Sequence, residues 1–310
     1  MGHTHLPKPD ASTTWESSWP TAIAQTVAPL QRGRADPTHR IVESAAHSGL
    51  PGVWRTSLTD DGPVSMLLTQ DDVHTLTCRA WGPGARRAVE NAPELCGAAD
   101  DPSEFRPDHP MLEGLLRRNR GLRIGRTNRV LEALIPAILE QRVLGRQATT
   151  AWRRLVRRYG TPAPGPAPEG MKVFPAPSTW AAIPAWEWHR LGVDPRRTRT
   201  IIACVRRAGR LERLSGLPTE DAKRLLCTID GIGVWTAAEI AQRAFGDTDA
   251  LSVGDVHLAR VVGHAMFNAD FDDDAMVAAL EPWRPHRYRV VRLLHAGGYA
   301  TRPRFAPQRQ

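Results

Sequence analysis

The chain has 310 residues, 41% of them hydrophobic, with a formal net charge of +8 and a pI near 10.0. This composition is typical of a globular protein with one large core or two smaller ones, and the positive charge favours a polyanionic partner. The sequence contains no run of about 18 apolar residues and no signal-type apolar core, so we expect neither a membrane span nor secretion, but a cytoplasmic protein.

The basic residues and the cysteines indicate which kinds of ligand site the chain can contain. Arginine supplies almost all of the positive charge, since the lysines are Lys8, Lys172 and Lys223. This bias fits bidentate phosphate contacts and equally fits the codon usage of a GC-rich genome. The four cysteines lie far apart without a C-x2-C pair, which argues against a zinc ribbon or an iron–sulfur loop. We therefore expect reduced thiols and no metal site.

In chain order, residues 1–14 are predicted to be a disordered tail. Residues 15–110 are predicted to form a small N-terminal α/β domain built on an antiparallel sheet. Short runs of β-branched, roughly alternating residues separated by turns indicate strands, at 53–58, 64–68 and 73–80. The segment 85–95 is predicted to be a helix that covers one face of the sheet.

Residues 111–300 are predicted to form a mainly helical domain, and 301–310 a flexible tail. Apolar residues at helical spacing between 128 and 159, including Leu144, predict two helices with a break at Gly145. The segment 160–178, rich in Pro, Ala and Gly, is predicted to be an extended connector. The predicted fold class is therefore α+β.

Further helix starts follow the connector. Asp194 and Pro195 predict an N-cap and first turn for a helix that runs from 196 to about 211. Another helix is predicted to start at 218–221, and a third spans 236–245 and ends at Gly246.

A hairpin separates the last two of these helices. Gly231 and Gly233 flank Ile232, and such a turn lets the backbone approach a phosphate without a Cβ in the way. The N-terminus of the following helix adds a positive dipole end. Most Gly-x-Gly triplets are simply turns, so the hairpin alone is weak evidence for phosphate binding.

A single carboxylate follows a second break. Asp255 comes directly after Gly254 and before a predicted helix at 256–267. The residues alone leave two roles open, a helix N-cap and a functional carboxylate. The two roles are compatible, because an N-cap carboxylate is held ionised by the helix end.

Three motifs carry a family resemblance: Glu-Ala-Leu-Ile-Pro-Ala-Ile-Leu-Glu-Gln-Arg-Val at 132–143, Gly-Ile-Gly-Val-Trp-Thr-Ala at 231–237, and Asp255 with Pro-Trp-Arg-Pro-His-Arg-Tyr at 282–288. In order and separation they resemble the helix-hairpin-helix (HhH-GPD) DNA glycosylases, specifically the 3-methyladenine DNA glycosylase II branch. The resemblance covers about half the chain, and the β-rich segment before it fits the family's small N-terminal domain.

The resemblance implies roles for individual residues. Asp255 matches the catalytic carboxylate, and Trp235 matches a position facing the flipped base; the bland alternative for Trp235 is a core side chain. For Trp283 we favour the core. Glu239 and His295 match two further base-pocket positions at which aromatic residues are familiar in the family, a departure that bears on the substrate range more than on the chemistry.

DNA contacts follow in the same way. Gly231, Gly233 and Thr236 belong to the hairpin that binds the DNA backbone. Arg142 stands where the family's wedge fills the gap left by the flipped nucleotide, and Gln141 would probe the orphan base. The alternative for Arg142 is that it is an ordinary surface arginine without a role in DNA binding. The acidic cluster at 270–274 is expected to be a solvated loop.

The resemblance implies a monofunctional DNA glycosylase that removes an alkylated base, an N-methylated purine above all, from duplex DNA in base excision repair. Bifunctional members carry a Schiff-base lysine where Trp235 stands, so no lyase step is expected. The alternative is a non-catalytic helix-hairpin-helix protein that binds damaged DNA. We expect a monomer at the bacterial nucleoid and no cofactor, with a monovalent cation at the hairpin as the one open alternative.

Overall fold

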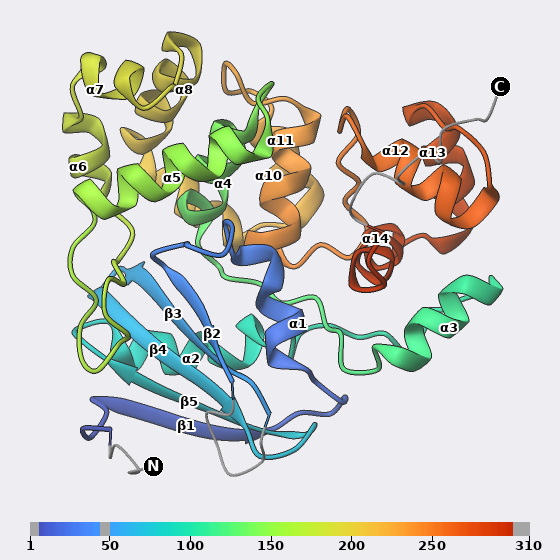
Figure 1. The fold of residues 1–310 in the computed structure, drawn as a ribbon, viewed down its shortest axis with the longest axis horizontal. Helices are drawn as coiled ribbons and strands as arrows, with labels where there is room; N and C mark the ends of the chain where they lie inside the picture. Colours follow the sequence, from blue (N-terminus) through green and yellow to red (C-terminus); the bar gives the residue numbers. More distant parts are fainter. Residues whose placement is uncertain (1–5, 44–49, 300–310) are drawn as a thin grey trace, which may run out of the picture.

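In a computed structural model of the chain, residues 6–43 and 50–299 are described. The tail predictions for 1–5 and 301–310 lie outside these residues. The N-terminal part contains a five-stranded antiparallel sheet in the order β1-β5-β4-β3-β2 (Figure 1). Its strands are β1 (Ala11–Glu16), β2 (His39–Val42), β3 (Gly52–Thr59), β4 (Gly62–Gln70) and β5 (Thr75–Trp81).

The sheet confirms the predicted meander of β3, β4 and β5 and adds an edge strand on each side. The predicted disorder of residues 11–14 is wrong, because these residues begin β1, which pairs with β5 from Ala11↔Ala80 to Glu16↔Thr75. As an edge strand, β1 takes its hydrogen bonds from one neighbour and buries none of its side chains fully. It therefore shows little of the apolar patterning that marks an inner strand.

Each face of the sheet is covered by a different segment. On one face α2 (Ala85–Leu95), as predicted, and the short α1 (Ile23–Val27) enclose a core whose members include Val53, Val64, Leu76, Ala88 and Ala92. On the other face Trp54 and Trp81 pack against Met171 of the connector. The sheet is thus the middle layer of a three-layer unit.

The connector at 160–178 is extended over most of its length, as predicted, and a helix begins at Pro177. A single antiparallel bridge links Pro162 and Lys172. Lys172 donates its N–H to the Pro37 carbonyl at 2.8 Å, and its own carbonyl accepts from Thr56 Oγ1 at 2.6 Å. The connector is therefore a strap that holds the sheet to the helical region.

The remaining elements form two helical clusters (Figure 1). The larger one surrounds α4 and the smaller one surrounds α14. The helices are η1 (Ala28–Leu30), α3 (Pro110–Arg118), α4 (Val130–Glu140), α5 (Gly145–Tyr159), α6 (Pro177–Ala182), α7 (Ala185–Arg190), α8 (Pro195–Val205), α9 (Ala208–Glu212), η2 (Arg213–Gly216), α10 (Thr219–Leu226), α11 (Val234–Ile240), η3 (Ala241–Phe245), α12 (Leu258–Val262), η4 (Gly263–Phe267), α13 (Asp273–Leu280), η5 (Glu281–Trp283) and α14 (Arg287–Ala296).

Most predicted helix boundaries agree with these bounds. Asp194 accepts hydrogen bonds from the N–H groups of Arg196 and Arg197 and so caps α8. The helix predicted to run to about 211 is broken after Val205, where α8 ends and α9 follows. Gly246 ends η3 with a φ of +69°, a left-handed conformation that glycine adopts without strain. Among the helices of the described residues, none has the length and apolar character needed to cross a membrane.

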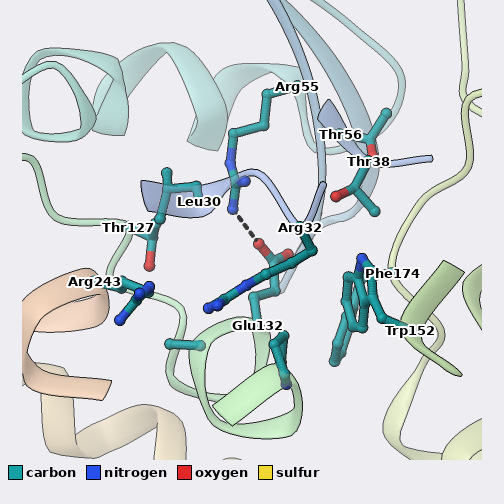
Figure 2. A pocket seen from close by; sticks show the side chains of 12 residues that line it. Leu30, Arg32, Thr38, Arg55, Thr56, Thr127, Glu132, Trp152, Phe174 and Arg243 are labelled. Carbon is teal, nitrogen blue, oxygen red and sulfur yellow. Dashed lines mark hydrogen bonds and ion pairs between the residues drawn. The ribbon is translucent and has the colours of Figure 1, made fainter. Parts of the chain in front are cut away.

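The junction between sheet and helices is polar, and Arg55 of the sheet pairs there with Glu132 of the helical region (Figure 2). Glu132, on α4, accepts hydrogen bonds from Arg55 at 2.7 Å, from the Ser57 hydroxyl at 2.6 Å and from the Leu58 N–H at 3.0 Å. Its side chain is 9% exposed and that of Arg55 6%. Burying such charges costs little when every partner is satisfied, so this junction fixes α4 against the sheet.

Candidate functional site

The hairpin between α10 and α11 has the predicted shape. Gly231 has a φ of +86°, and a Cβ there would lie 2.2 Å from Thr200 Oγ1, so both conformation and space require glycine. Gly233 is exposed, and a Cβ at this residue would meet no atom within 4 Å. Ile232 is buried and anchors the turn. The tip of the hairpin is thus free to approach a ligand closely.

The loop between α4 and α5 is tied to this hairpin. Gln141 donates from Nε2 to the Gly231 carbonyl at 2.9 Å and to Thr236 Oγ1 at 2.8 Å. Its amide nitrogen is therefore occupied within the protein, and contact with an orphan base stays a prediction. Thr236 is buried and serves as an acceptor for Gln141.

Arg142 stands at the tip of that loop. It is exposed, has a φ of +54° and forms no ion pair within residues 6–43 and 50–299. Two residues on, Leu144 is 63% exposed, which corrects its sequence-based placement on the packed face of a helix. Leu144 precedes α5 in an extended conformation, so the helical spacing did not apply to it. An exposed cation and an exposed apolar side chain therefore lie two residues apart in this loop.

Asp255 lies at the entrance to α12, as predicted. Its Oδ1 accepts the N–H groups of His257 at 2.9 Å and Leu258 at 3.0 Å, the geometry of a helix cap. Its Oδ2 accepts the indole Nε1–H of Trp235 over a long 3.4 Å. Asp255 has no ion-pair partner among the described residues. One carboxylate oxygen is therefore held by the backbone, while the other points toward Trp235.

Trp235 and Asp255 are both half-exposed, so the region between them is not a closed core. Next to each stands an apolar side chain that sequence reasoning missed: Val234 is 67% exposed and Val256 79% exposed. Isolated apolar residues on a surface are ordinary, but these two flank the predicted site. Trp283, in contrast, is 8% exposed, which confirms its placement in the core.

The acidic cluster at 270–274 has structural contacts that the expectation of a solvated loop did not include. Asp272 caps α13 by accepting the Ala275 N–H at 2.9 Å, and Asp270 pairs with His264 at 2.8 Å. Asp273 Oδ2 accepts the N–H of Gly254 at 3.0 Å. Since Gly254 directly precedes Asp255, Asp273 helps to position the loop that carries Asp255.

Glu239 lies deeper than a residue lining an open pocket. It is 8% exposed, pairs with Arg243 at 2.8 Å and accepts the Ser252 hydroxyl at 2.6 Å. Burial alone would raise the pKa of Glu239, but the Arg243 charge and the Ser252 hydroxyl outweigh it and keep the pKa below the usual range. The structure therefore places this carboxylate in an internal ion pair, which differs from the predicted contact with a base.

His295 is half-buried on α14. Burial and the nearby Arg292 charge lower its pKa to about 4, against the opposing influence of the Glu239 and Asp255 carboxylates. The imidazole is therefore neutral at neutral pH. A neutral ring adds no positive charge that would repel a cationic ligand near Trp235.

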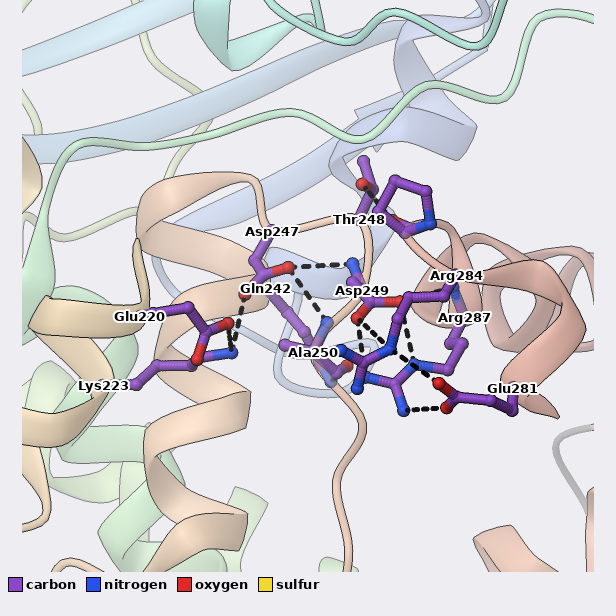
Figure 3. Close-up of polar contacts among 11 residues, drawn as sticks. Glu220, Lys223, Gln242, Asp247, Thr248, Asp249, Ala250, Glu281, Arg284 and Arg287 are labelled. Carbon is purple, nitrogen blue, oxygen red and sulfur yellow. Dashed lines mark hydrogen bonds and ion pairs between the residues drawn. The ribbon is translucent and has the colours of Figure 1, made fainter. Parts of the chain in front are cut away.

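A charged network fixes the chain between Trp235 and Asp255 (Figure 3). Asp247 accepts the N–H groups of Asp249 and Ala250 and pairs with Lys223 at 3.2 Å. Asp249 in turn pairs with Arg287 of α14 at 2.6 Å. The loop that leads to Asp255 is thus fastened to α10 on one side and to α14 on the other.

Comparison with known proteins supports the resemblance drawn from the motifs. No protein-family model matches the chain. A stretch of 151 residues, 48% of the chain, is 32% identical to a probable bifunctional transcriptional activator/DNA repair enzyme AlkA from Mycobacterium tuberculosis. The matched stretch is 30% of that relative's length, so the chain spans well under two thirds of it.

Two solved structures align over nearly the whole chain. The 3-methyladenine DNA glycosylase from Archaeoglobus fulgidus has a TM-score of 0.76 at 16% identity, covering 93% of this chain and 98% of that one. An 8-oxoguanine glycosylase/lyase from Clostridium acetobutylicum, solved with double-stranded DNA, has a TM-score of 0.67 at 12% identity, covering 94% and 98%. The chain therefore has the fold of these DNA glycosylases, which confirms the predicted fold class.

Proposed function

We propose that the chain is a DNA glycosylase that flips an alkylated base out of duplex DNA and hydrolyses its N-glycosidic bond. The observation that carries the proposal is the geometry of Asp255. Two backbone N–H groups hold Oδ1, Oδ2 faces the half-exposed Trp235, and no cation among the described residues neutralises the carboxylate. A purely structural cap would not need a second oxygen directed at an exposed aromatic ring.

The chemistry follows from charge. A purine methylated on a ring nitrogen is cationic, so it takes the bonding electrons from C1′ and leaves as a neutral base without a strong general acid. The sugar becomes positively charged in this step, and a nearby carboxylate stabilises it. Water then bonds to C1′, and its proton passes to the Asp255 carboxylate or to solvent.

Trp235 supports a cationic substrate. An indole face attracts cations, and the attraction grows when water is displaced. The similar proteins point the same way, since one is a probable DNA repair enzyme and another is a 3-methyladenine DNA glycosylase. We propose an N-methylated purine as the substrate class on these grounds.

The absence of a lyase step is part of the proposal. An abasic-site lyase of this kind needs a neutral amine as a Schiff-base nucleophile. The lysine nearest to the hairpin, Lys223, pairs with Glu220 at 2.6 Å and Asp247 at 3.2 Å. Burial lowers its pKa, but the hydrogen bond and charge of these two carboxylates outweigh burial and raise the pKa above its usual value. It is therefore protonated and unsuited to that role.

The test measures abasic sites formed in methylated duplex DNA by the wild type, Asp255→Asn and a matched control, Asp272→Asn. Asp272 caps α13 with a similar backbone contact but lies outside the site. We expect Asp255→Asn to lose about 10²–10³-fold in rate while retaining lesion binding, and Asp272→Asn to stay near wild type.

Two outcomes would count against this mechanism. Equal rates for wild type and Asp255→Asn would remove the carboxylate from the chemistry. A wild type that binds methylated duplex yet releases no methylated purine would favour the alternative, a non-catalytic protein that recognises damaged DNA.

A further inference from the structure

Exposed arginines follow one side of the chain from the start of α8 into α9. Five of them, Arg196, Arg199, Arg206, Arg207 and Arg210, are called here the arginine row. Arg196, Arg199, Ala203 and the C-cap residue Arg206 recur at intervals of three and four residues, the spacing that places side chains on a single face of α8. Arg207 precedes α9 and Arg210 lies on it. The segment 195–211 contains no acidic residue.

The arginine row lacks ionic partners within the described residues, as do some exposed arginines elsewhere, among them Arg79 and Arg118; the row is distinguished by its spacing and by its place beside the hairpin. None of its members forms an ion pair within residues 6–43 and 50–299. By contrast, Arg86 pairs with Glu90, Arg117 with Glu113 and Arg224 with Asp221. A run of unpaired like charges repels itself, so it lowers stability unless an anionic ligand compensates.

The arginine row borders the hairpin. Thr200, on the same helix, donates to the Asp230 carbonyl of the hairpin at 3.2 Å. Arg207 and Arg210 line one side of a groove of about 430 Å³, and Thr228 and Asp230 line the other. A ligand that reaches the hairpin can therefore continue directly along the arginine row.

We propose that the arginine row is a second contact for the DNA backbone, which lengthens the protein's grip on the duplex beyond the hairpin. This inference rests on the proposed function for the identity of the ligand. From Arg196 to Arg206 the row is about 15 Å long at 1.5 Å per residue. The phosphates of one strand recur about every 3.4 Å along the duplex axis, so a row lying parallel to that axis can face about four of them.

The guanidinium chemistry fits this ligand. Each guanidinium presents a fork of N–H donors that matches phosphate oxygens, stays charged at any physiological pH and is weakly hydrated. The groove wall includes Leu211, Leu214, Leu225 and Ile229, which lower the local dielectric and strengthen charge attraction. Asp230 is the single acidic residue among those that line the groove. Its backbone carbonyl accepts a hydrogen bond from the Thr200 hydroxyl.

The experiment measures binding of undamaged duplex DNA as a function of salt. The variant is Arg199→Gln/Arg207→Gln/Arg210→Gln, and the control carrying the same change in charge is Arg79→Gln/Arg86→Gln/Arg118→Gln, on β5, α2 and α3. Each phosphate contact contributes about 0.9 to the slope of log Kobs against log salt. We expect the row variant to reduce the slope by about 2–3 and the control variant to leave it at the wild-type value.

The outcomes separate this inference from the proposed function. A row variant with the wild-type slope, or a control variant with an equal loss, would overturn the second contact even if the wild type excises bases. A wild type without salt-dependent duplex binding would overturn both proposals. Because the measurement uses undamaged DNA, a protein that binds DNA but releases no base would still support the arginine row. A melting temperature of the row variant at or above that of the wild type, and a cooperative melting transition of the control variant, would show that both variants fold.

Discussion

Two regions of the molecule differ in how their charged side chains are paired. One is the junction between the sheet and the helices, and the other is the surface formed by α8 and the hairpin. At the junction, Arg55 and Glu132 are buried and hydrogen-bonded to each other. On α8 and at its C-cap, Arg199 and Arg206 are exposed without an ionic partner among the described residues. A paired, buried charge fixes the fold, whereas an unpaired, exposed charge remains available to a ligand.

The largest effect that tests this comparison is expected at the junction. Glu132→Ala leaves Arg55, the Ser57 hydroxyl and the Leu58 N–H buried without their acceptor. Loss of one partner from a buried pair costs about 3–5 kcal/mol, and we expect this decrease in the free energy of unfolding from urea titrations at neutral pH. Glu113→Ala, which breaks an exposed pair, should cost less than about 1 kcal/mol. Equal losses would contradict the comparison.

A second effect at the junction depends on pH. His39 is 1% exposed, both ring nitrogens lack a hydrogen-bond partner, and burial with the Arg55 charge lowers its pKa to about 4, against the influence of Asp36. The unfolded chain therefore binds a proton below about pH 6.5 that the folded protein accepts only near pH 4. Stability is fully present above about pH 6.5 and is lost as the pH falls toward 4, by on the order of 3 kcal/mol.

His39→Leu isolates this contribution. Between pH 6.5 and 4, we expect its free energy of unfolding to fall less steeply than that of the wild type, whatever its stability at neutral pH. The pKa of His295 is also lowered to about 4, so the free energy of unfolding of the variant still falls somewhat as the pH decreases. Parallel curves for the two proteins would show that His39 is not the group responsible.

The smallest effect on stability is expected for an exposed arginine without an ionic partner among the described residues, Arg142. Arg142→Ala removes no contact within the described residues, so the free energy of unfolding should change by less than about 0.5 kcal/mol. If Arg142 stacks in the gap left by a flipped nucleotide, binding to lesion-bearing duplex should weaken by about 1 kcal/mol, measured by fluorescence anisotropy. A loss of equal size on unmodified single strands would indicate a phosphate contact alone.

Features determined by local sequence were predictable. The strands β3 to β5 were recognisable because they alternate apolar and polar residues. The start of α8 was recognisable because Asp194 is a favourable N-cap residue and Pro195 suits the first turn of a helix. The turn at Gly231 was recognisable because only glycine fits its backbone conformation and the space around it. The candidate site was located in the same way, through Asp255 and Trp235, because their motifs carried a family resemblance.

Features that depend on distant partners were not predictable. The hydrogen bond from Gly254 to Asp273 and the ion pair of Glu239 arise only when helices pack together. Residue type suggested a solvated carboxylate for Asp273, and the family resemblance suggested a ligand contact for Glu239. Strand β1 was not predicted for a related reason: it is paired with β5, which lies far along the chain.

The two hydrogen bonds of Gln141 have a geometric consequence. They join the loop that carries Arg142 to the hairpin at Gly231 and Thr236, so the two segments form one rigid unit before any ligand arrives. In the proposed complex with DNA, such a unit would fix the distance between the phosphate bound at the hairpin and the side chain inserted from the loop. The interrogated nucleotide would then lie at one constant offset from that phosphate, whatever the surrounding sequence.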